Sequence, residues 1–182
     1  MLKKDLPNQG EMVLSPEEIA VAVAELARRI DQDYADKEVM IVGLLRGVFI
    51  LLADLVLEME IAPEIDFLTV RSYGKSTVTS GNVEVVCDLQ DSIEGKHVIV
   101  VDDIIDTGHT IAFLDPILRA RGPASIEYCM LLDKPERRME NFDIEVKYIG
   151  RQVPNKFLYG YGLDGGDLVR RNVNGVWTLG SE

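Results

Sequence analysis

The sequence predicts an α/β fold in which a largely parallel, twisted sheet is flanked by helices. Short apolar runs, mostly of β-branched residues and bounded by turn residues, are typical of buried strands. They alternate along the chain with segments in which apolar residues recur at helical spacing, and this alternation favours a parallel sheet. The length of 182 residues is enough to bury a sizeable core, so residues 1–182 are expected to form a single domain.

The first half of the chain is predicted to contain two helices, two strands and a long loop. Ser15 to Glu18 form a capping box with proline at the first helical position, and a helix of about twenty residues is expected to follow. Residues 39–44 form a strand-like run, and residues 48–57 are apolar nearly all round, which predicts a buried helix packed on the sheet. Residues 64–71 are predicted to form a strand. Residues 72–82 are small, hydroxylated and bracketed by glycine, which is typical of an exposed functional loop.

The second half of the chain continues the alternation of strands and helices. One helix is predicted over residues 111–119, and Gly122 and Pro123 are expected to end it. The sequence contains neither an internal repeat nor a low-complexity segment. The expected strands are residues 83–87, 98–101, 125–132 and 146–149, the last of them short and followed by a glycine-rich tail.

The stretch from His97 to Thr110 carries the strongest chemical signal. Its apolar strand runs into three carboxylates, Asp102, Asp103 and Asp106, and then into a small segment that precedes the next helix. The acids are therefore expected at the carboxyl end of a parallel strand, where open α/β sheets bind their ligands. Adjacent carboxylates suit a ribose diol or a hydrated magnesium ion, and the third aspartate is then free to act as a base.

The residues that follow the carboxylates are suited to a phosphate group. Backbone amides around Gly108 at a helix start, together with the hydroxyls of Thr107 and Thr110, form an anion-binding nest. The plain alternative is that the three acids are solvated loop residues. That is the commoner case for any one aspartate, but it accounts less well for the combination of acids, hydroxyls and glycine.

Four other motif matches lack the context that their function requires. Residues 74–76 resemble the end of a phosphate-binding loop, but Thr69 stands at the required upstream glycine. Residues 160–165 match a dinucleotide-binding glycine pattern without a following βαβ unit. Residues 106–108 spell the aspartic-protease triplet, which requires a second copy in a β-rich fold. Residues 102–106 match the DDxxD signature of helical prenyl-transfer enzymes, but here the preceding residues are a strand.

Composition limits the partners and the surroundings of the protein. The net charge of −12 disfavours nonspecific attraction to nucleic acid or to an anionic membrane, so an anionic ligand requires local amides, Lys, Arg or a cation. No apolar run is long enough to cross a bilayer, and the first residues lack the apolar core of a signal peptide. Cys87 and Cys129 are too few for a disulfide framework and are expected to be two buried reduced thiols, which suits a cytoplasmic protein.

The segment VVDDIIDTGHT, at residues 100–110, is similar to the phosphoribosyl-pyrophosphate-binding motif of the type I phosphoribosyltransferases. The resemblance to the hypoxanthine-guanine members extends over most of the chain. It implies the type I phosphoribosyltransferase fold, with a small hood built from the N-terminal segment and about residues 150–182. The supporting pieces are LLRG at Leu44–Gly47, RSYG at Arg71–Gly74, LLDKPERR at Leu131–Arg138, and KFLYGYGLD with a trailing arginine at Lys156–Arg170.

The resemblance also implies a reaction. A 5-phosphoribosyl group passes from phosphoribosyl pyrophosphate to N9 of hypoxanthine or guanine, which gives IMP or GMP and pyrophosphate in purine salvage, with Mg²⁺ as cofactor. Asp106 would be the general base or proton relay at the purine N7, and Asp102 with Asp103 would bind the ribose hydroxyls and associated magnesium. The residues that would wrap the 5′-phosphate are Asp106, Thr107, Gly108, His109 and Thr110.

The other implied contacts divide between the pyrophosphate and the purine. Arg46 and Gly47 would hold pyrophosphate, and whether the Leu45–Arg46 peptide is cis is left open. Ser72 and Tyr73 match the mobile loop that closes over the site, because an oxocarbenium-like transition state must be shielded from water. The remaining contacts are Lys134 to the purine 6-oxo group, Phe157 stacked on the base, Leu158 reading its edge through the backbone, Asp164 at a second magnesium and Arg170 at pyrophosphate.

The sequence departs from the family pattern near both groups of implied contacts. Asp102 and Asp103 stand where many members have Glu-Asp, His109 takes a variable position, and residues 165–168 lack the aromatics common after the Leu-Asp pair. Two alternatives stay open, a xanthine-preferring enzyme and a regulator of the same fold that senses phosphoribosyl pyrophosphate or a nucleotide. The intact Asp106 and the SYGK loop favour catalysis. The expected partners are phosphoribosyl pyrophosphate and a 6-oxopurine, with no nucleic acid and no membrane, and a homodimer or homotetramer is a family expectation.

Overall fold

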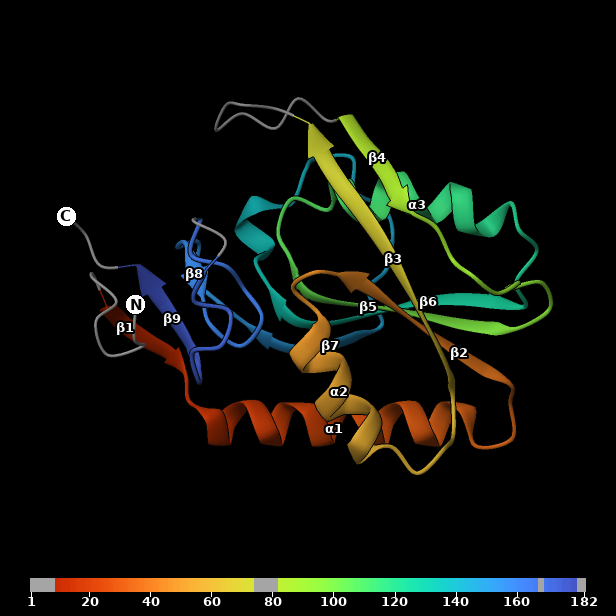
Figure 1. Ribbon diagram of the computed structural model, residues 1–182, viewed down its shortest axis with the longest axis horizontal. Coiled ribbons are helices and arrows are strands. Elements are labelled where there is room, and N and C mark those ends of the chain that lie inside the picture. Colours follow the sequence, from red (N-terminus) through yellow and green to blue (C-terminus); the bar gives the residue numbers. More distant parts are fainter. Residues whose placement is uncertain (1–8, 74–81, 167–168, 180–182) are drawn as a thin grey trace.

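A six-stranded sheet with the order β4-β3-β2-β5-β6-β7 forms the centre of the fold (Figure 1). The structure is a computed structural model that describes residues 9–73, 82–166 and 169–179. All neighbouring strands of this sheet are parallel except the β3–β4 pair at one edge, so the predicted largely parallel sheet is confirmed. Its strands are β2 Val39–Leu45, β3 Glu64–Tyr73, β4 Asn82–Cys87, β5 His97–Ile105, β6 Ser125–Asp133 and β7 Tyr148–Gln152.

Helices cover both faces of the sheet, as the sequence predicts. Helices α1 (Pro16–Tyr34) and α2 (Phe49–Glu58) pack on one face, and α3 (His109–Arg119) packs on the other (Figure 1). The predicted capping box is present, because the Ser15 hydroxyl accepts the Glu18 N–H at 3.2 Å while the Glu18 carboxylate accepts the Ser15 N–H at 2.8 Å. Pro16 has no N–H, so this capping box satisfies two of the three N–H groups that the start of α1 leaves without helical partners.

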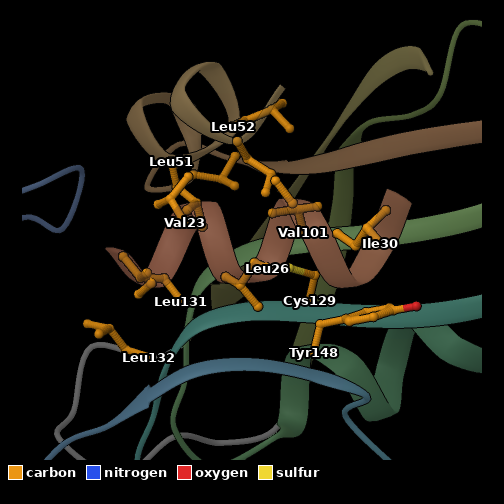
Figure 2. Close-up of a cluster of buried hydrophobic side chains, with 14 of the residues drawn as sticks. Val23, Leu26, Ile30, Leu51, Leu52, Val101, Cys129, Leu131, Leu132 and Tyr148 are labelled. Atoms are coloured by element: carbon orange, nitrogen blue, oxygen red, sulfur yellow. The ribbon is translucent and has the colours of Figure 1, made fainter. Parts of the chain in front are cut away.

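Apolar side chains from α1, α2 and the sheet fill the larger core. Figure 2 shows Leu26 of α1 and Leu51 of α2 converging with Val101 and Cys129 from the sheet, and all four are fully buried. Close packing of this kind holds the central strands rigidly, so the residues at their carboxyl ends are fixed in position. The prediction that both cysteines are buried is wrong for Cys87, which lies on the edge strand β4 and is exposed.

Several elements differ in extent from the sequence prediction. Helix α2 is buried on one face only, since Phe49 is 47% exposed and Leu57 84% exposed. Strand β5 continues past Val101 to Ile105, because its parallel pairing with β6 persists to that point. Strand β3 likewise includes Ser72 and Tyr73, which pair with β4 rather than opening the predicted loop. Residues 74–81 of that loop lie outside the described residues.

A second, three-stranded antiparallel sheet brings the two ends of the described chain together. Strands β1 (Gln9–Leu14), β9 (Val176–Leu179) and β8 (Leu158–Tyr159) pair in that order, beside the main sheet (Figure 1). None of these strands is predicted from the sequence, because they are short and pair with partners far along the chain. No helix in the described ranges is long and apolar enough to cross a membrane.

Candidate active site

A cavity of about 550 Å³ opens where the carboxyl ends of the central strands meet the segments that lead to and from β8. Polar and charged side chains make up most of its wall. The cavity therefore lies where ligands bind in open α/β sheets. Its lining residues are Gly47, Asp103, Ile104, Asp106, Lys134, Arg137, Asn155, Lys156, Phe157, Leu158, Leu163, Asp164 and Arg171.

Gly47 lets three segments of the chain meet at one side of the cavity. It follows β2 and the cis peptide Leu45–Arg46. A Cβ atom at Gly47 would lie 1.6 Å from Oδ2 of Asp103, and a Cβ atom at Gly162 would lie 2.0 Å from the Gly47 carbonyl oxygen. Only glycine fits at either position, because any side chain would collide with the carboxylate or with the backbone. The turn after β2 is thereby held against β5 and against the turn after β8.

The two adjacent aspartates of β5 occupy different environments. Successive side chains of a strand point to opposite faces, and only Asp103 of the pair lines the cavity. The Asp103 N–H donates to the Asp102 carboxylate at 2.9 Å. Burial raises the pKa of Asp103 to about 6, and burial beside Asp103 raises the pKa of Asp102 well above its ordinary range.

Two cations approach the carboxylate of Asp106. The Arg137 Nε atom lies 3.0 Å from Oδ1, and the Lys134 Nζ atom lies 3.8 Å from Oδ2. Lys134 is only 6% exposed, and this burial lowers the pKa of its ammonium group although Asp106 opposes the shift. The Lys134 N–H donates to the Ile105 carbonyl at 3.0 Å, which fixes the end of β6 against the end of β5. An acceptor and a donor thus face the same part of the cavity.

The segment after Asp106 forms a tight turn that leads into α3. Gly108 caps α3 in the left-handed region with φ 87°, and a Cβ atom there would lie 2.5 Å from the Phe142 ring. The first N–H groups of a helix lack helical partners and favour an anion, so the start of α3 can stabilise one. Thr107 Oγ1 lies 2.9 Å from His109 Nδ1, which orders the loop side chains.

The segment after β6 anchors this loop from behind. Arg138 donates to the Asp106 carbonyl at 3.1 Å and pairs with the buried Asp133, and the Met139 N–H donates to the Thr107 carbonyl at 3.1 Å. These bonds join β6 and the short helix η2 (Pro135–Arg137) to the loop. The loop position is therefore set by the main sheet rather than by the loop sequence alone.

The opposite wall of the cavity comes from the chain around β8. Phe157 is 53% exposed at the cavity, and Leu158 is buried within β8. Asp164 accepts the Gly166 N–H at 2.8 Å and forms an ion pair with Arg171. This wall supplies one aromatic face, one carboxylate and one guanidinium to the cavity.

Comparisons with known proteins agree with this geometry. A model of the phosphoribosyl transferase domain matches residues 9–164. The chain belongs to the phosphoribosyltransferase family. It is similar to a hypoxanthine-guanine phosphoribosyltransferase from Aquifex aeolicus, with 43% identity over 88% of this chain and 89% of the relative. A solved hypoxanthine phosphoribosyltransferase from Staphylococcus aureus has a TM-score of 0.88 at 37% identity, covering 94% of this chain and 92% of that one. Another, from Trypanosoma cruzi in complex with the product IMP, has a TM-score of 0.86 at 32% identity and covers 96% of each chain.

The cavity of this phosphoribosyltransferase brings together about half of the residues expected from the sequence. Ser72 and Tyr73 lie at the end of β3, and their side chains fall outside what the structure describes. The guanidinium of Arg170 lies over the Tyr159 ring at 5.4 Å. The predicted residues that line the cavity are Gly47, Asp103, Asp106, Lys134, Phe157, Leu158 and Asp164, and those outside its lining are Arg46, Asp102, Thr107, Gly108, His109, Thr110 and Arg170.

Two arginines of the cavity were missed by the sequence reasoning. Arg137 belongs to the LLDKPERR piece and pairs with Asp106, so its place in a matching segment was the available signal. Arg171 directly follows Arg170, but no sequence pattern distinguishes the two neighbours. Both missed residues add positive charge to a cavity in a protein whose net charge is −12.

Two carboxylates of this phosphoribosyltransferase offer the kind of oxygen donors that a magnesium ion prefers. Among the described residues, no group of three or more His, Cys, Asp or Glu side chains is arranged to hold a metal. Asp103 and Asp164 nevertheless line the same cavity and supply hard oxygen donors. Magnesium is commonly held by one or two carboxylates, with phosphate oxygens and waters completing the octahedron. Such a donor set suits a metal bound together with a diphosphate.

Proposed function

We propose that the protein transfers the 5-phosphoribosyl group from phosphoribosyl pyrophosphate to N9 of hypoxanthine or guanine, giving IMP or GMP and pyrophosphate. The observation that carries the proposal is the pairing of the buried Lys134 with Asp106 in a cavity walled by Phe157, directly before a phosphate loop. A base, a ribose and a phosphate can lie in that order along the cavity. The family membership supports the same reaction.

The purine is recognised by a donor and an acceptor with separate tasks. The Lys134 ammonium group has only N–H donors. It can therefore donate a hydrogen bond to a 6-oxo group, but it has no acceptor for the 6-amino group of adenine. Asp106 takes the proton from N7 as N9 bonds to C1′ and the bond from C1′ to the pyrophosphate oxygen breaks. Phe157 stacks on the base, and the Leu158 backbone reads its edge.

The phosphates are held by backbone and charge at both ends of the cavity. Thr107, Gly108, His109 and Thr110 wrap the 5′-phosphate at the start of α3. Arg46, Gly47 and Arg170 bind pyrophosphate, and Ser72 and Tyr73 belong to the segment that shields the reacting C1′ from water. These assignments follow the resemblance residue by residue.

The carboxylates serve ribose and metal. Asp102 and Asp103 bind the ribose hydroxyls and a magnesium ion, and Asp164 contributes to a second one. Phosphoribosyltransferases of this type generally use Mg²⁺. When bound, the ion neutralises the charge that develops on the leaving pyrophosphate.

The wider organisation follows the family expectation. We infer a single domain whose hood comes from the N-terminal segment and about residues 150–182, assembled as a homodimer or homotetramer in the cytoplasm. Neither a nucleic acid nor a membrane is a partner. Light scattering of the purified protein would measure the assembly directly, and a monomer would overturn that part of the proposal.

A turnover assay tests the reaction. Purified protein is incubated with phosphoribosyl pyrophosphate, Mg²⁺ and hypoxanthine, guanine, xanthine or adenine in parallel, and nucleotide and pyrophosphate are quantified. We expect IMP and GMP in amounts equal to pyrophosphate, with little product from adenine. XMP as the main product would shift the assignment to xanthine. No nucleotide from any base, together with tight binding of phosphoribosyl pyrophosphate, would indicate a sensor of the same fold.

A further inference from the structure

The two oxygens of the Asp106 carboxylate have different surroundings. Oδ1 is buried, and the Arg137 Nε atom lies 3.0 Å from it in an ion pair rather than a hydrogen bond. The Lys134 Nζ atom lies 3.8 Å from Oδ2, which exceeds hydrogen-bond distance. The Asp106 side chain is 35% exposed, and of its two oxygens only Oδ2 can be open to the cavity. The carboxylate therefore presents one oxygen to a ligand and turns the other towards Arg137.

One short segment holds both the backbone and the side chain of Asp106. Arg138 donates to the Asp106 carbonyl at 3.1 Å, and its neighbour Arg137 is the last residue of η2. The Arg137 N–H donates to the Lys134 carbonyl at 3.1 Å, and the Arg138 N–H donates to the Pro135 carbonyl at 3.2 Å. These bonds close the turn of η2 and join it to Asp106, so the backbone of Arg137 is held beside that residue.

The proposed reaction requires a fixed orientation of this carboxylate. A general base must lie within hydrogen-bond reach of the proton that it removes, and a misplaced base loses much of its effect. A carboxylate turns readily about its terminal torsion, because that torsion has broad minima. A cation on one side of Asp106 favours the orientation in which the other oxygen stays beside the Lys134 ammonium group. The N7 proton and the 6-oxo group are neighbours on a purine, so the base and the donor are needed side by side.

We propose that Arg137 is a positioning residue, which holds Oδ1 of Asp106 and thereby directs Oδ2 at the N7 proton of the purine. The proposal rests on the proposed function, because Asp106 is the base only in that reaction. In this role Arg137 contacts neither the purine nor phosphoribosyl pyrophosphate. Its loss should therefore reduce turnover rather than substrate binding, and only while Asp106 is present.

Steady-state kinetics of Arg137→Met test the proposal. The Arg137 side chain is 45% exposed, so the replacement removes the guanidinium with little loss of buried packing. We expect kcat with hypoxanthine to fall about tenfold, as for coupling within an ion pair, and the KM for phosphoribosyl pyrophosphate to stay within about twofold. Arg137→Lys keeps a positive charge near Oδ1 and should recover part of kcat. An unchanged kcat in Arg137→Met would overturn the proposal.

A double variant separates positioning from direct contact with a substrate. Asp106→Asn removes the base, so the addition of Arg137→Met should lower its kcat by no more than about twofold. A loss as large as that in the wild-type background would show that Arg137 acts through a contact of its own, which overturns the proposal.

Inhibition by 7-deazahypoxanthine gives a second readout that does not need the double variant. This analogue has carbon in place of N7, so it gives Asp106 no proton to take. Its Ki should therefore be the same for the wild-type protein and for Arg137→Met. A Ki that rises as kcat falls would indicate a direct or structural role for Arg137 and would also overturn the proposal.

The controls distinguish this inference from the proposed function. Arg119→Met is the matched control, because it removes an Arg–Asp ion pair with Asp115 on α3, outside the cavity lining, and it should leave kcat unchanged. Arg137→Gln replaces Arg137→Met if the methionine variant does not fold. If the wild-type protein forms no nucleotide from any base, the proposed function is wrong. If it does and the neutral Arg137 variant is equally fast, only the role of Arg137 is wrong.

Discussion

Replacement of Lys134 by methionine tests the purine recognition most directly. Methionine keeps the length and the apolar stem but removes the ammonium group, which is nearly buried and lies 3.8 Å from Asp106. The lost hydrogen bond to the 6-oxo group is charge-assisted, so its loss should cost about 1.5–3 kcal/mol of transition-state stabilisation. This corresponds to a fall of about 10- to 150-fold in kcat/KM for hypoxanthine and guanine.

The assay compares wild-type and Lys134→Met proteins with hypoxanthine and adenine at saturating phosphoribosyl pyrophosphate. The kcat/KM for adenine should not fall with the kcat/KM for hypoxanthine, because the ammonium group has no acceptor for the 6-amino group of adenine. Lys96→Met is the matched control, since it removes an ion pair with Glu64 near the amino end of β5. Equal losses of hypoxanthine and adenine turnover in Lys134→Met would refute the recognition argument.

The same variant gives a prediction for stability. Burial lowers the pKa of Lys134 below its ordinary value of 10.5, so the unfolded chain binds more protons than the folded chain between the two values. The unfolding free energy of the wild-type protein, relative to Lys134→Met, should therefore rise with pH across this window. Denaturant unfolding at a series of pH values measures the difference, and a fall with increasing pH would contradict the effect of burial.

Three other predictions follow from the site and the core. Asp106→Asn should lower kcat by at least about a hundredfold while the Kd of phosphoribosyl pyrophosphate changes little. Asp143→Asn is its control, because Asp143 is exposed, and unchanged turnover in Asp106→Asn would exclude Asp106 as the base. Gly47→Ala should weaken binding of phosphoribosyl pyrophosphate and lower the Tm, because its Cβ would lie 1.6 Å from the Asp103 carboxylate, and a variant with wild-type affinity would refute that packing. A thiol reagent should modify the exposed Cys87 in the native protein but reach Cys129 only after denaturation, because Cys129 is buried and burial raises the pKa of its thiol to about 12. Modification of two thiols in the native protein would contradict this prediction.

The sequence predicted correctly those elements whose patterns are complete within a few neighbouring residues. The β-branched runs of the central strands and the capping box at Ser15 are each complete within a few residues, and both are present in the structure. The small sheet gives no such signal, because β8 has two residues and β1 pairs with β9 across most of the chain. Its strands are defined by their partners rather than by their own composition.

The candidate site likewise contains residues that the sequence predicted and contacts that it could not predict. Asp103, Asp106 and Lys134 follow strands that the sequence predicts, and the cavity contains all three. The adjacent arginines could not be separated from the sequence, because only the folded chain shows that Arg171 and not Arg170 belongs to the lining of the cavity. The close approach of Gly162 to Gly47 is likewise a contact between distant segments, which the spacing of glycines does not encode.

The order of strands in the small sheet has a consequence for synthesis of the chain. Strand β9 lies between β1 and β8 and is synthesised after all the other strands that the structure describes. Until it emerges, β1 has no partner and the Phe157 side of the cavity has no support, although every strand of the main sheet has already been made. A nascent chain can therefore form the turn between β5 and α3 well before the wall of the cavity that carries Phe157 is supported.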